Sequence, residues 1–533
     1  MKNINKIITF AIGMLLVALS SCDLDREPND YISFDKSYNN MKDAKMWDNG
    51  IYSTLRGKFG GAYILPQEIQ ADMLSAHETY SGLYGTFHGW TVKAENDVIK
   101  EVYHSYYAAL LDANIVIDKI PTLKVNDDDK AQLDVFLGDA YFARAFYNFN
   151  LALRWAMPYN EATANTDLGI ALETKPFDLE KPARATNSQT YSLILEDLKK
   201  AESFLSLVKG KEGNEEISRD VVIALRSRVY LYMGNMEKAL EESEKLINFN
   251  TYPLIDALPE GMKDPEGKTN PFVEMWQLDN GKEQIWLPYV NKPNEIPTTI
   301  SLYGADMGTW QYWKEKGVDN KDFNRPTYLP TGTVMYQLFN DENDRRIPAY
   351  FEDCYTTIND KEDQAVVFVI SKFKGNPKHK TLDSEHWGGY VPNGICSPKP
   401  FRIAEQYLIA SEAAFETKDE SKAMFYLNIL KKSRGLKEIN LKGEELLNAI
   451  RQEKAREMCF EGFRLWDLRR WHMPVNERVR QGMVKEHIVP ARFFSSDFDF
   501  FKSIPADNPK FVWGFPRDEV AQINKNIIQN KGW

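Results

Sequence analysis

The stretch "AIRQEKAREMCFEGFRLWDLRRW" (Ala449 to Trp471) combines a helical pattern with a high density of charged side chains. Within it, Glu453, Glu457 and Arg464 lie within two to three helical turns of one another. Side chains of opposite charge at such a separation can form a buried ion-pair network that docks the last helix onto the rest of the chain. We therefore interpret this stretch as structural rather than as a ligand-binding site.

Helical periodicity also dominates the N-terminal part of the chain. Apolar residues recur every three or four positions from Ser37 to Lys58 and again from Asn96 to Trp155, which is the pattern of amphipathic helices. The segment from Asp139 to Trp155 is apolar on nearly all sides. A helix without a polar face is buried, so this segment predicts a central helix of the fold.

Two other segments each predict a pair of helices. In Arg219 to Phe249 the helices meet at Gly234-Asn235, and in Phe401 to Gly435 they meet near Thr417 to Asp419. The first pair resembles a tetratricopeptide repeat unit, and the second repeats the same design. Long insertions separate the copies.

The segment 252–400 differs in kind from the helical parts. It contains many prolines and glycines, five of the twelve tryptophans and short β-like runs such as Ala365 to Ile370. We predict a mainly α fold: a tetratricopeptide-like helical repeat scaffold with a large irregular, partly β insertion that carries binding residues. Within one integrated domain, the parts are N-terminal helical repeats at 37–251, the insertion at 252–400 and C-terminal helices at 401–533.

The first residues, "MKNINKIITFAIGMLLVALSSC", have the layout of a secretory signal. Lys2 and Lys6 precede an apolar run from Ile7 to Leu19 that is short for a membrane span. The end of the run resembles a bacterial lipobox, in which Cys22 would be acylated after removal of residues 1–21. An ordinary signal peptide with an incidental cysteine is the alternative. Residues 22–36 predict a flexible tether.

Composition and motifs narrow the function. The formal charge of −11 disfavours nucleic acid as a partner. The chain has no serine-hydrolase elbow, zinc-protease motif or glycine-rich phosphate loop, and Cys354, Cys396 and Cys459 form neither a disulfide framework nor a zinc site. We predict no cofactor and no metal site. A secreted glycan hydrolase stays an alternative, because its two carboxylates need only be close in space.

Two aromatic-rich segments need an explanation. "DMGTWQYW" (Asp306 to Trp313) and "HETYSGLYGTFHGW" (His77 to Trp90) place several rings in irregular sequence. Such rings are either buried in the core or exposed as a platform on which a ligand stacks. The residues alone leave both interpretations open.

The stretch quoted first strongly resembles the terminal signature of the SusD/RagB family of Bacteroidetes outer-membrane lipoproteins. Its matching positions are Arg451, Glu453, Glu457, Glu461-Gly462, Arg464, Asp467-Leu468 and Arg470-Trp471. Further landmarks in the expected order are "CDLDREP", "NGIYSTL", "AYFARAFYNFNLALRW", "NDENDRRIPAYF" and "RIAEQYLIASEAAF". The resemblance runs from Cys22 to the end, and it departs from the family at Trp155 to Pro158, where a Tyr-Gly pair, an acid and a proline are usual.

The resemblance implies a non-catalytic lipoprotein on the outer surface of the outer membrane, attached by its lipid alone. Such proteins capture oligosaccharides and pass them to a SusC-like TonB-dependent transporter; peptides or glycopeptides are the alternative ligands. In the family the early and middle insertions converge on one ligand face, which favours the platform interpretation. The expected ligand-binding residues are Trp310, Tyr312, Trp313, Tyr84, His88 and Trp90, and the expected structural residues are Glu453, Glu457, Glu461, Arg464 and Asp467.

Overall fold

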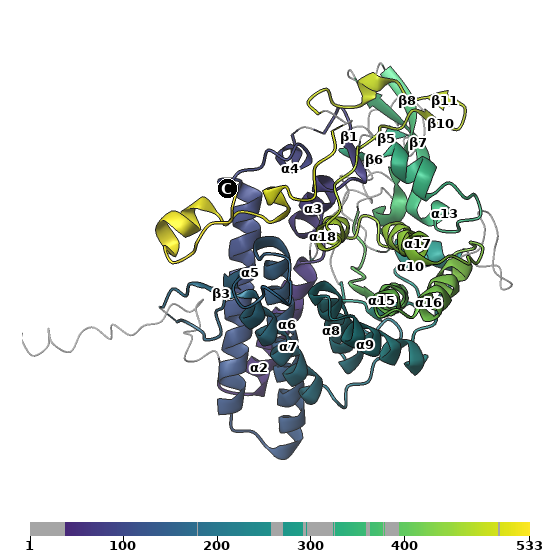
Figure 1. The fold of residues 1–533 in the computed structure, drawn as a ribbon. Coiled ribbons are helices and arrows are strands. Elements are labelled where there is room, and N and C mark those ends of the chain that lie inside the picture. Colours follow the sequence, from purple (N-terminus) through teal and green to yellow (C-terminus); the bar gives the residue numbers. More distant parts are fainter. Residues whose placement is uncertain are drawn as a thin grey trace, which may run out of the picture.

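The structure is a computed structural model, and most of its ordered elements are helices (Figure 1). It describes residues 38–80, 82–178, 180–256, 270–290, 295, 323–324, 326–358, 363–376, 378, 394–498 and 502–533. The helices are α2 (Met41–Gly57), α3 (Leu65–Gln70), α4 (Gly85–His88), α5 (Asp97–Lys119), α6 (Asp127–Trp155), α7 (Asn187–Phe204), α8 (Arg219–Met233), α9 (Met236–Phe249), α10 (Pro271–Gln277), α13 (Ile347–Tyr350), α15 (Ile403–Glu416), α16 (Glu420–Ser433), α17 (Gly443–Glu457) and α18 (Arg464–Arg470).

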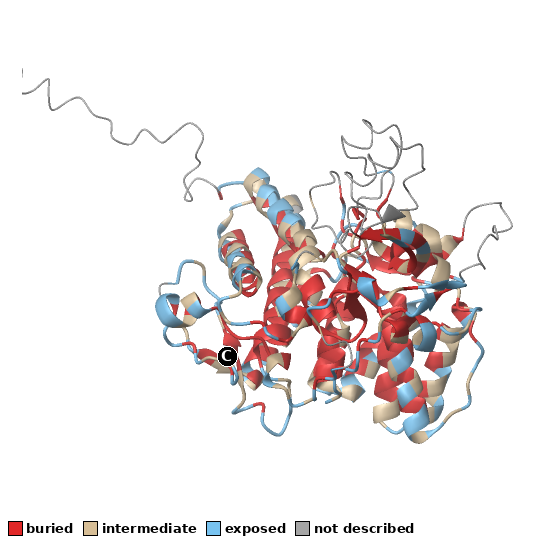
Figure 2. Ribbon diagram, turned by 90° about the horizontal axis from the view of Figure 1, so that it is seen from above, coloured by how far each residue is buried: buried red, intermediate tan, exposed pale blue. Residues whose placement is uncertain are grey.

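The N-terminal helices pack around α6, as the sequence predicted for the segment that ends at Trp155. α6 contacts α2, α5, α7 and α8, and most of its side chains from Phe136 onward are buried in the largest hydrophobic cluster. At its end, the indole N–H of Trp155 donates a hydrogen bond to the Gly514 carbonyl at 2.8 Å. The C-terminal segment is therefore anchored to α6. Figure 2 shows buried residues along the facing sides of these helices.

Both predicted helix pairs are present. α8 ends at Gly234 in the left-handed conformation (φ 73°), and the Asn235 side chain caps α9 by accepting from the Lys238 N–H. α15 and α16 are joined through Lys418 (φ 69°), and the Asp419 side chain caps the start of α16. α15 also packs against α9, so the two pairs lie side by side although more than 150 residues of sequence separate them.

The strands are short, and two of their pairs, β1 with β6 and β4 with β9, connect the 252–400 segment to other parts of the chain. β7 (Phe351–Ile358) and β8 (Asp363–Ile370) are antiparallel, which confirms the strand predicted at Ala365 to Ile370. β5 (Phe323–Asn324) runs parallel to β7. The two-stranded pairs are β1 (Leu74–Ala76) with β6 (Tyr328–Pro330), β2 (Leu168–Ala171) with β3 (Arg184–Thr186), β4 (Gln284–Trp286) with β9 (Phe401–Arg402), and β10 (Met483–Val484) with β11 (His487–Ile488).

A buried ion-pair cluster surrounds Glu457 at the end of α17. Its carboxylate accepts hydrogen bonds from Arg402 at 2.6 Å, Arg434 at 3.0 Å and Arg346 at 3.2 Å. All four side chains are fully buried. Arg346 also pairs with Glu453 at 2.6 Å. This confirms that Glu453 and Glu457 belong to a buried network, and the network joins α17 to segments far away in the sequence.

Three signature residues are positioned differently from one another. Arg464 does not join Glu453 and Glu457, which corrects the prediction, because the chain turns between α17 and α18 at Phe460 (φ 65°) and Gly462 (φ 90°). Its guanidinium instead forms two hydrogen bonds with Asp72, at 2.8 and 2.9 Å. Glu461 pairs with Lys372 and Arg402, and Asp467 pairs with Lys454 and Arg470.

The cluster lowers the carboxyl pKa values in the folded state. Burial alone would raise the pKa of Glu453, but the charges of Arg346 and Arg456 outweigh burial and lower it from 4.5 to about 2. Burial is likewise outweighed at Glu457, where Arg434, Arg402 and Arg346 hold the pKa well below its ordinary value. The ionised carboxylates of Glu453 and Glu457 therefore stabilise the fold at pH values above the carboxyl pKa of the unfolded chain. This stabilisation is lost as the pH falls through their lower pKa values in the folded protein.

We predict that Glu457→Gln lowers the free energy of unfolding at neutral pH by about 3–5 kcal/mol, because three buried guanidinium groups lose a shared charge partner. In the unaltered protein, stability should decrease as the pH falls from 4.5 to about 2. Chemical denaturation at several pH values measures both effects.

The matched control is Glu445→Gln, an exposed glutamate of the same helix. It should change stability by less than about 0.5 kcal/mol. A Glu457→Gln protein as stable as this control would show that the cluster is not important for the fold.

Candidate ligand-binding face

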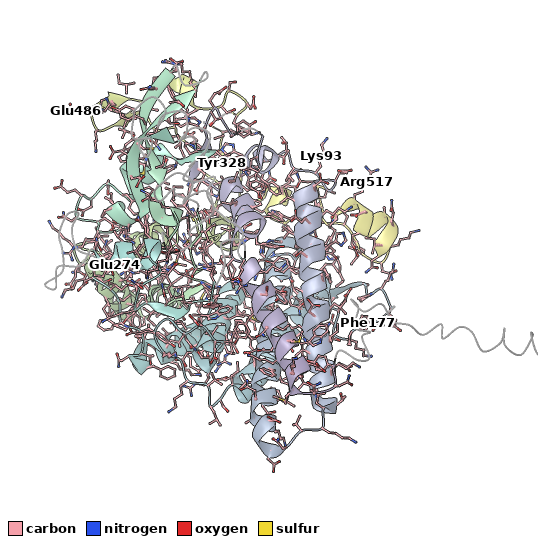
Figure 3. All side chains as sticks on the ribbon, turned by 180° about the vertical axis from the view of Figure 1, so that it is seen from behind. Lys93, Phe177, Glu274, Tyr328, Glu486 and Arg517 are labelled. Atoms are coloured by element: carbon pink, nitrogen blue, oxygen red, sulfur yellow. The ribbon has the colours of Figure 1, made fainter. Side chains whose placement is uncertain are left out.

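Three segments that are distant in sequence meet beside β1. The N–H of His77 donates to the Thr327 carbonyl at 3.0 Å, next to the β1–β6 pair. On the other side of β1, the N–H of Glu78 donates to the Phe493 carbonyl at 2.9 Å, and Ser495 donates back to Ala76 at 3.1 Å. β1 is therefore held between residues 327–330 and 493–495, and Figure 3 labels Tyr328 in this region.

The chain then turns tightly into α4, and three glycines lie in and next to this turn. Gly82 and Tyr84 adopt left-handed conformations with φ of 76° and 53°. A Cβ atom at Gly85 would lie 2.9 Å from the Tyr80 ring, and one at Gly89 would lie 3.3 Å from the Phe498 ring. The aromatic rings rest directly on this turn because the glycines have no side chains.

An aromatic patch forms on this turn, and we define it as Tyr80, Leu83, Tyr84 and Phe498. Leu83 is 40% exposed, and the three rings are partly exposed. The centroids of the Tyr80 and Phe498 rings lie 5.3 Å apart in an edge-to-face arrangement. Glu78 and Asp497 are exposed, and each is close in sequence to a residue of the patch. The Tyr80 hydroxyl donates a short hydrogen bond to the Asp497 carboxylate.

The hydroxyl groups of the patch stay protonated over the physiological range. Burial and then the hydrogen bond and charge of Asp497 raise the pKa of Tyr80 to about 12. Burial and the charge of Glu101 raise the pKa of Tyr84. The patch therefore offers neutral rings and hydroxyls next to carboxylate acceptors, which suits a ligand with flat apolar faces and hydroxyl donors.

His88 and Trp90 belong to the core, which corrects the expectation that they contact a ligand. His88 is fully buried between Phe498 and Tyr328, with ring centroids 4.3 and 5.6 Å away. Burial, helped by Arg478, holds its pKa well below the ordinary value, so the ring is neutral. Trp90 is 7% exposed, and its indole N–H donates to the Gln70 carbonyl at 2.9 Å.

Of the other predicted site residues, only Tyr84 lies in the described part of the chain, where it is partly exposed within the patch. Trp310, Tyr312 and Trp313 lie outside the described residues, and so does Cys22. Their roles stay predictions.

The sequence analysis did not identify Tyr80, Asp497 or Phe498. Tyr80 stands in the aromatic segment His77 to Trp90 but was not distinguished from its neighbours. Asp497 and Phe498 belong to the run "FFSSDFDFF" (Phe493 to Phe501), whose density of rings and acids resembles that of the two aromatic segments. That similarity was the available signal, although it does not reveal that the run lies beside β1.

Comparison with known proteins gives consistent matches along the chain. A family model described as "Starch-binding associating with outer membrane" matches residues 35–231, and one described as "SusD family" matches residues 273–533. A SusD-like protein from Formosa agariphila is 24% identical over 560 aligned residues, which cover 97% of this chain and 99% of that protein.

Two solved structures illustrate that other proteins share this fold. A SusD superfamily protein from Bacteroides thetaiotaomicron aligns with a TM-score of 0.69 at 22% identity, covering 92% of this chain and 99% of that one. A laminarin-binding SusD-like protein aligns with a TM-score of 0.62 at 18% identity, covering 93% of this chain and 100% of that one. At these identities the likeness establishes the fold.

We predict different stability effects for the two kinds of aromatic residue. Trp90→Ala should lower the free energy of unfolding by about 3–5 kcal/mol, because it opens a cavity and removes a hydrogen bond. Tyr80→Ala should cost only about 1 kcal/mol, because its ring is partly exposed. Chemical denaturation of both variants tests the assignment, which an equal loss of stability would contradict.

Proposed function

The chain belongs to the SusD/RagB family, and we propose that it is a non-catalytic cell-surface lipoprotein that captures oligosaccharides and delivers them to a SusC-like TonB-dependent transporter. The aromatic patch is the observation that carries the oligosaccharide part of this proposal. Sugar rings have apolar C–H faces that stack on phenol and phenyl rings, while carboxylates accept hydrogen bonds from their hydroxyls. Tyr80 and Phe498 offer such rings, and Asp497 offers such a carboxylate.

Trp310, Tyr312 and Trp313 are proposed to extend the same face. Their support is the aromatic character of the segment and the convergence of the two insertions that the family resemblance implies. The laminarin-binding relative supports a glycan as the ligand class. Peptides or glycopeptides are the second candidate, since partly exposed rings also accept apolar side chains.

Membrane attachment is proposed to occur through Cys22 alone, after removal of residues 1–21. Among the described residues, no helix combines the length and apolar character that a membrane crossing requires. Acyl chains on Cys22 would each contribute about 0.8 kcal/mol per buried methylene, which is sufficient for a stable anchor when several chains are present.

We predict that Tyr80→Ala and Phe498→Ala together weaken binding of a soluble oligosaccharide by about tenfold, because stacked rings contribute about 0.5–1.5 kcal/mol each. Isothermal titration calorimetry with a panel that includes laminarin fragments measures the change. Phe425→Ala is the control, because Phe425 is an exposed ring (58%) on α16, away from the patch.

The double variant Trp310→Ala with Trp313→Ala tests the proposed extension of the face. It should weaken binding to a similar degree while the melting temperature changes little, because exposed rings contribute little to stability. Binding of peptides but of no oligosaccharide by the unaltered protein would favour the second candidate, and turnover of a glycan would favour a hydrolase.

We predict that Cys22→Ala releases the protein from membranes, because no thiol is then available for acylation. Fractionation of cells that lack the transporter measures this, with the unaltered chain as the reference. A variant that still sediments with membranes would contradict the proposed anchor.

A further inference from the structure

Arg478 joins two short helices next to the candidate ligand-binding face. The residue is 7% exposed, and its guanidinium donates hydrogen bonds to three main-chain carbonyls. These are the carbonyls of Gln70 at 2.8 Å, Ala71 at 2.7 Å and His88 at 2.6 Å. Gln70 and His88 are the last residues of α3 and α4, which pack against each other (Figure 1). One side chain therefore connects the ends of both helices.

The helix α4 needs such a contact more than most helices do. It has only four residues, and no side chain caps its N-terminus. A helix of this length is not stable on its own. The last carbonyls of a helix have no donor within the helix, and arginine side chains can supply one. The hydrogen bond from Arg478 to the His88 carbonyl therefore helps to fix where α4 lies.

The chain between α3 and the end of α4 carries three of the four residues of the aromatic patch. Arg478 contacts this segment near both of its ends. Its guanidinium binds the His88 carbonyl at the exit, and its own main-chain carbonyl accepts a hydrogen bond from the Ser75 hydroxyl, in β1 at the entry, at 3.2 Å. The Nε2 of His88 also donates to the Leu74 carbonyl at 3.2 Å. The segment is therefore closed at its base.

The guanidinium of Arg478 is charged in this buried position. Burial lowers its pKa to about 10 against the opposing charge of Asp72, so it stays protonated at neutral pH. A buried charge is costly unless it is hydrogen-bonded, so separating the guanidinium from its carbonyls is unfavourable. Lysine has a single nitrogen and cannot reproduce the planar arrangement of donors that reaches three carbonyls.

We propose that Arg478 is a positioning residue of the candidate ligand-binding face, and that it acts through α4. By fixing the end of this helix it holds Tyr84, the residue before α4, in its left-handed conformation (φ 53°). A bulky side chain adopts this conformation only where its surroundings enforce it. The rings of the patch are thereby kept in one arrangement before a ligand arrives. The effect on ligand affinity rests on the proposed function, whereas the fixing of α4 does not.

The first test is amide hydrogen exchange of the ligand-free protein. Arg478→Lys should accelerate exchange in residues 82–90 by about tenfold or more, because hydrogen bonds to a charged group are lost at the base of the segment. Exchange in α8 and α9 should stay unchanged. Arg480→Lys is the matched control, a partly exposed arginine two positions away, and it should leave residues 82–90 unaltered.

The second test is calorimetry with laminarin fragments, well below the melting temperature. Arg478→Lys should weaken binding by about tenfold, because the ligand must then order the rings itself. A saturating ligand should restore slow exchange in residues 82–90. Glu457→Gln loses stability elsewhere in the fold and should bind with unchanged affinity, which separates positioning of the face from general stabilisation.

A milder variant keeps the proposal testable if Arg478→Lys does not fold. Ser75→Ala removes only the hydrogen bond to the Arg478 carbonyl and should accelerate exchange in the same residues to a smaller extent. Unchanged exchange in residues 82–90, acceleration spread evenly over the chain, or unchanged affinity of Arg478→Lys would each overturn the proposal. If the unaltered protein binds no oligosaccharide, the proposed function fails, and the ligand-free exchange still decides whether Arg478 fixes α4.

Discussion

The carboxylate of Glu457 is the point on which much of this fold depends. It lies at the end of α17 and is fully buried, and its charge is compensated by Arg346, Arg402 and Arg434. None of these four charges is stable in an apolar interior without the others, so the segments that carry them must assemble together. A single buried acid thereby connects the 252–400 segment with α15, α16 and α17.

The aromatic patch depends on the packing around β1. β1 is held between β6 and residues 493–495, and the turn after it is held by buried His88 and Trp90. These two residues fix the backbone, and the small Gly85 and Gly89 let Tyr80 and Phe498 lie directly on it. Because the backbone under these rings is already fixed, little conformational entropy is lost when a ligand binds.

The charge beside the patch gives it a ligand preference. Glu78 and Asp497 are exposed carboxylates next to the patch residues in the sequence, and Asp497 accepts a hydrogen bond from Tyr80. Such a surface suits neutral ligands with hydroxyl donors better than anions.

The sequence by itself determined the helical stretches at 37–58 and 96–155, both helix pairs, the strand at Ala365 to Ile370 and the burial of Glu453 and Glu457, because periodicity and turn residues act over a few positions. Only the tertiary structure decided the partners of Glu457, since Arg434, Arg402 and Arg346 lie 23, 55 and 111 positions away. It also decided which rings of the His77 to Trp90 segment are buried. In an irregular turn no fixed period assigns side chains to the inside or the outside. His88 enters the core because Tyr328 and Phe498 pack against it, and Trp90 enters it through Phe511 and Gln70. Tyr80 stays partly exposed beside Phe498.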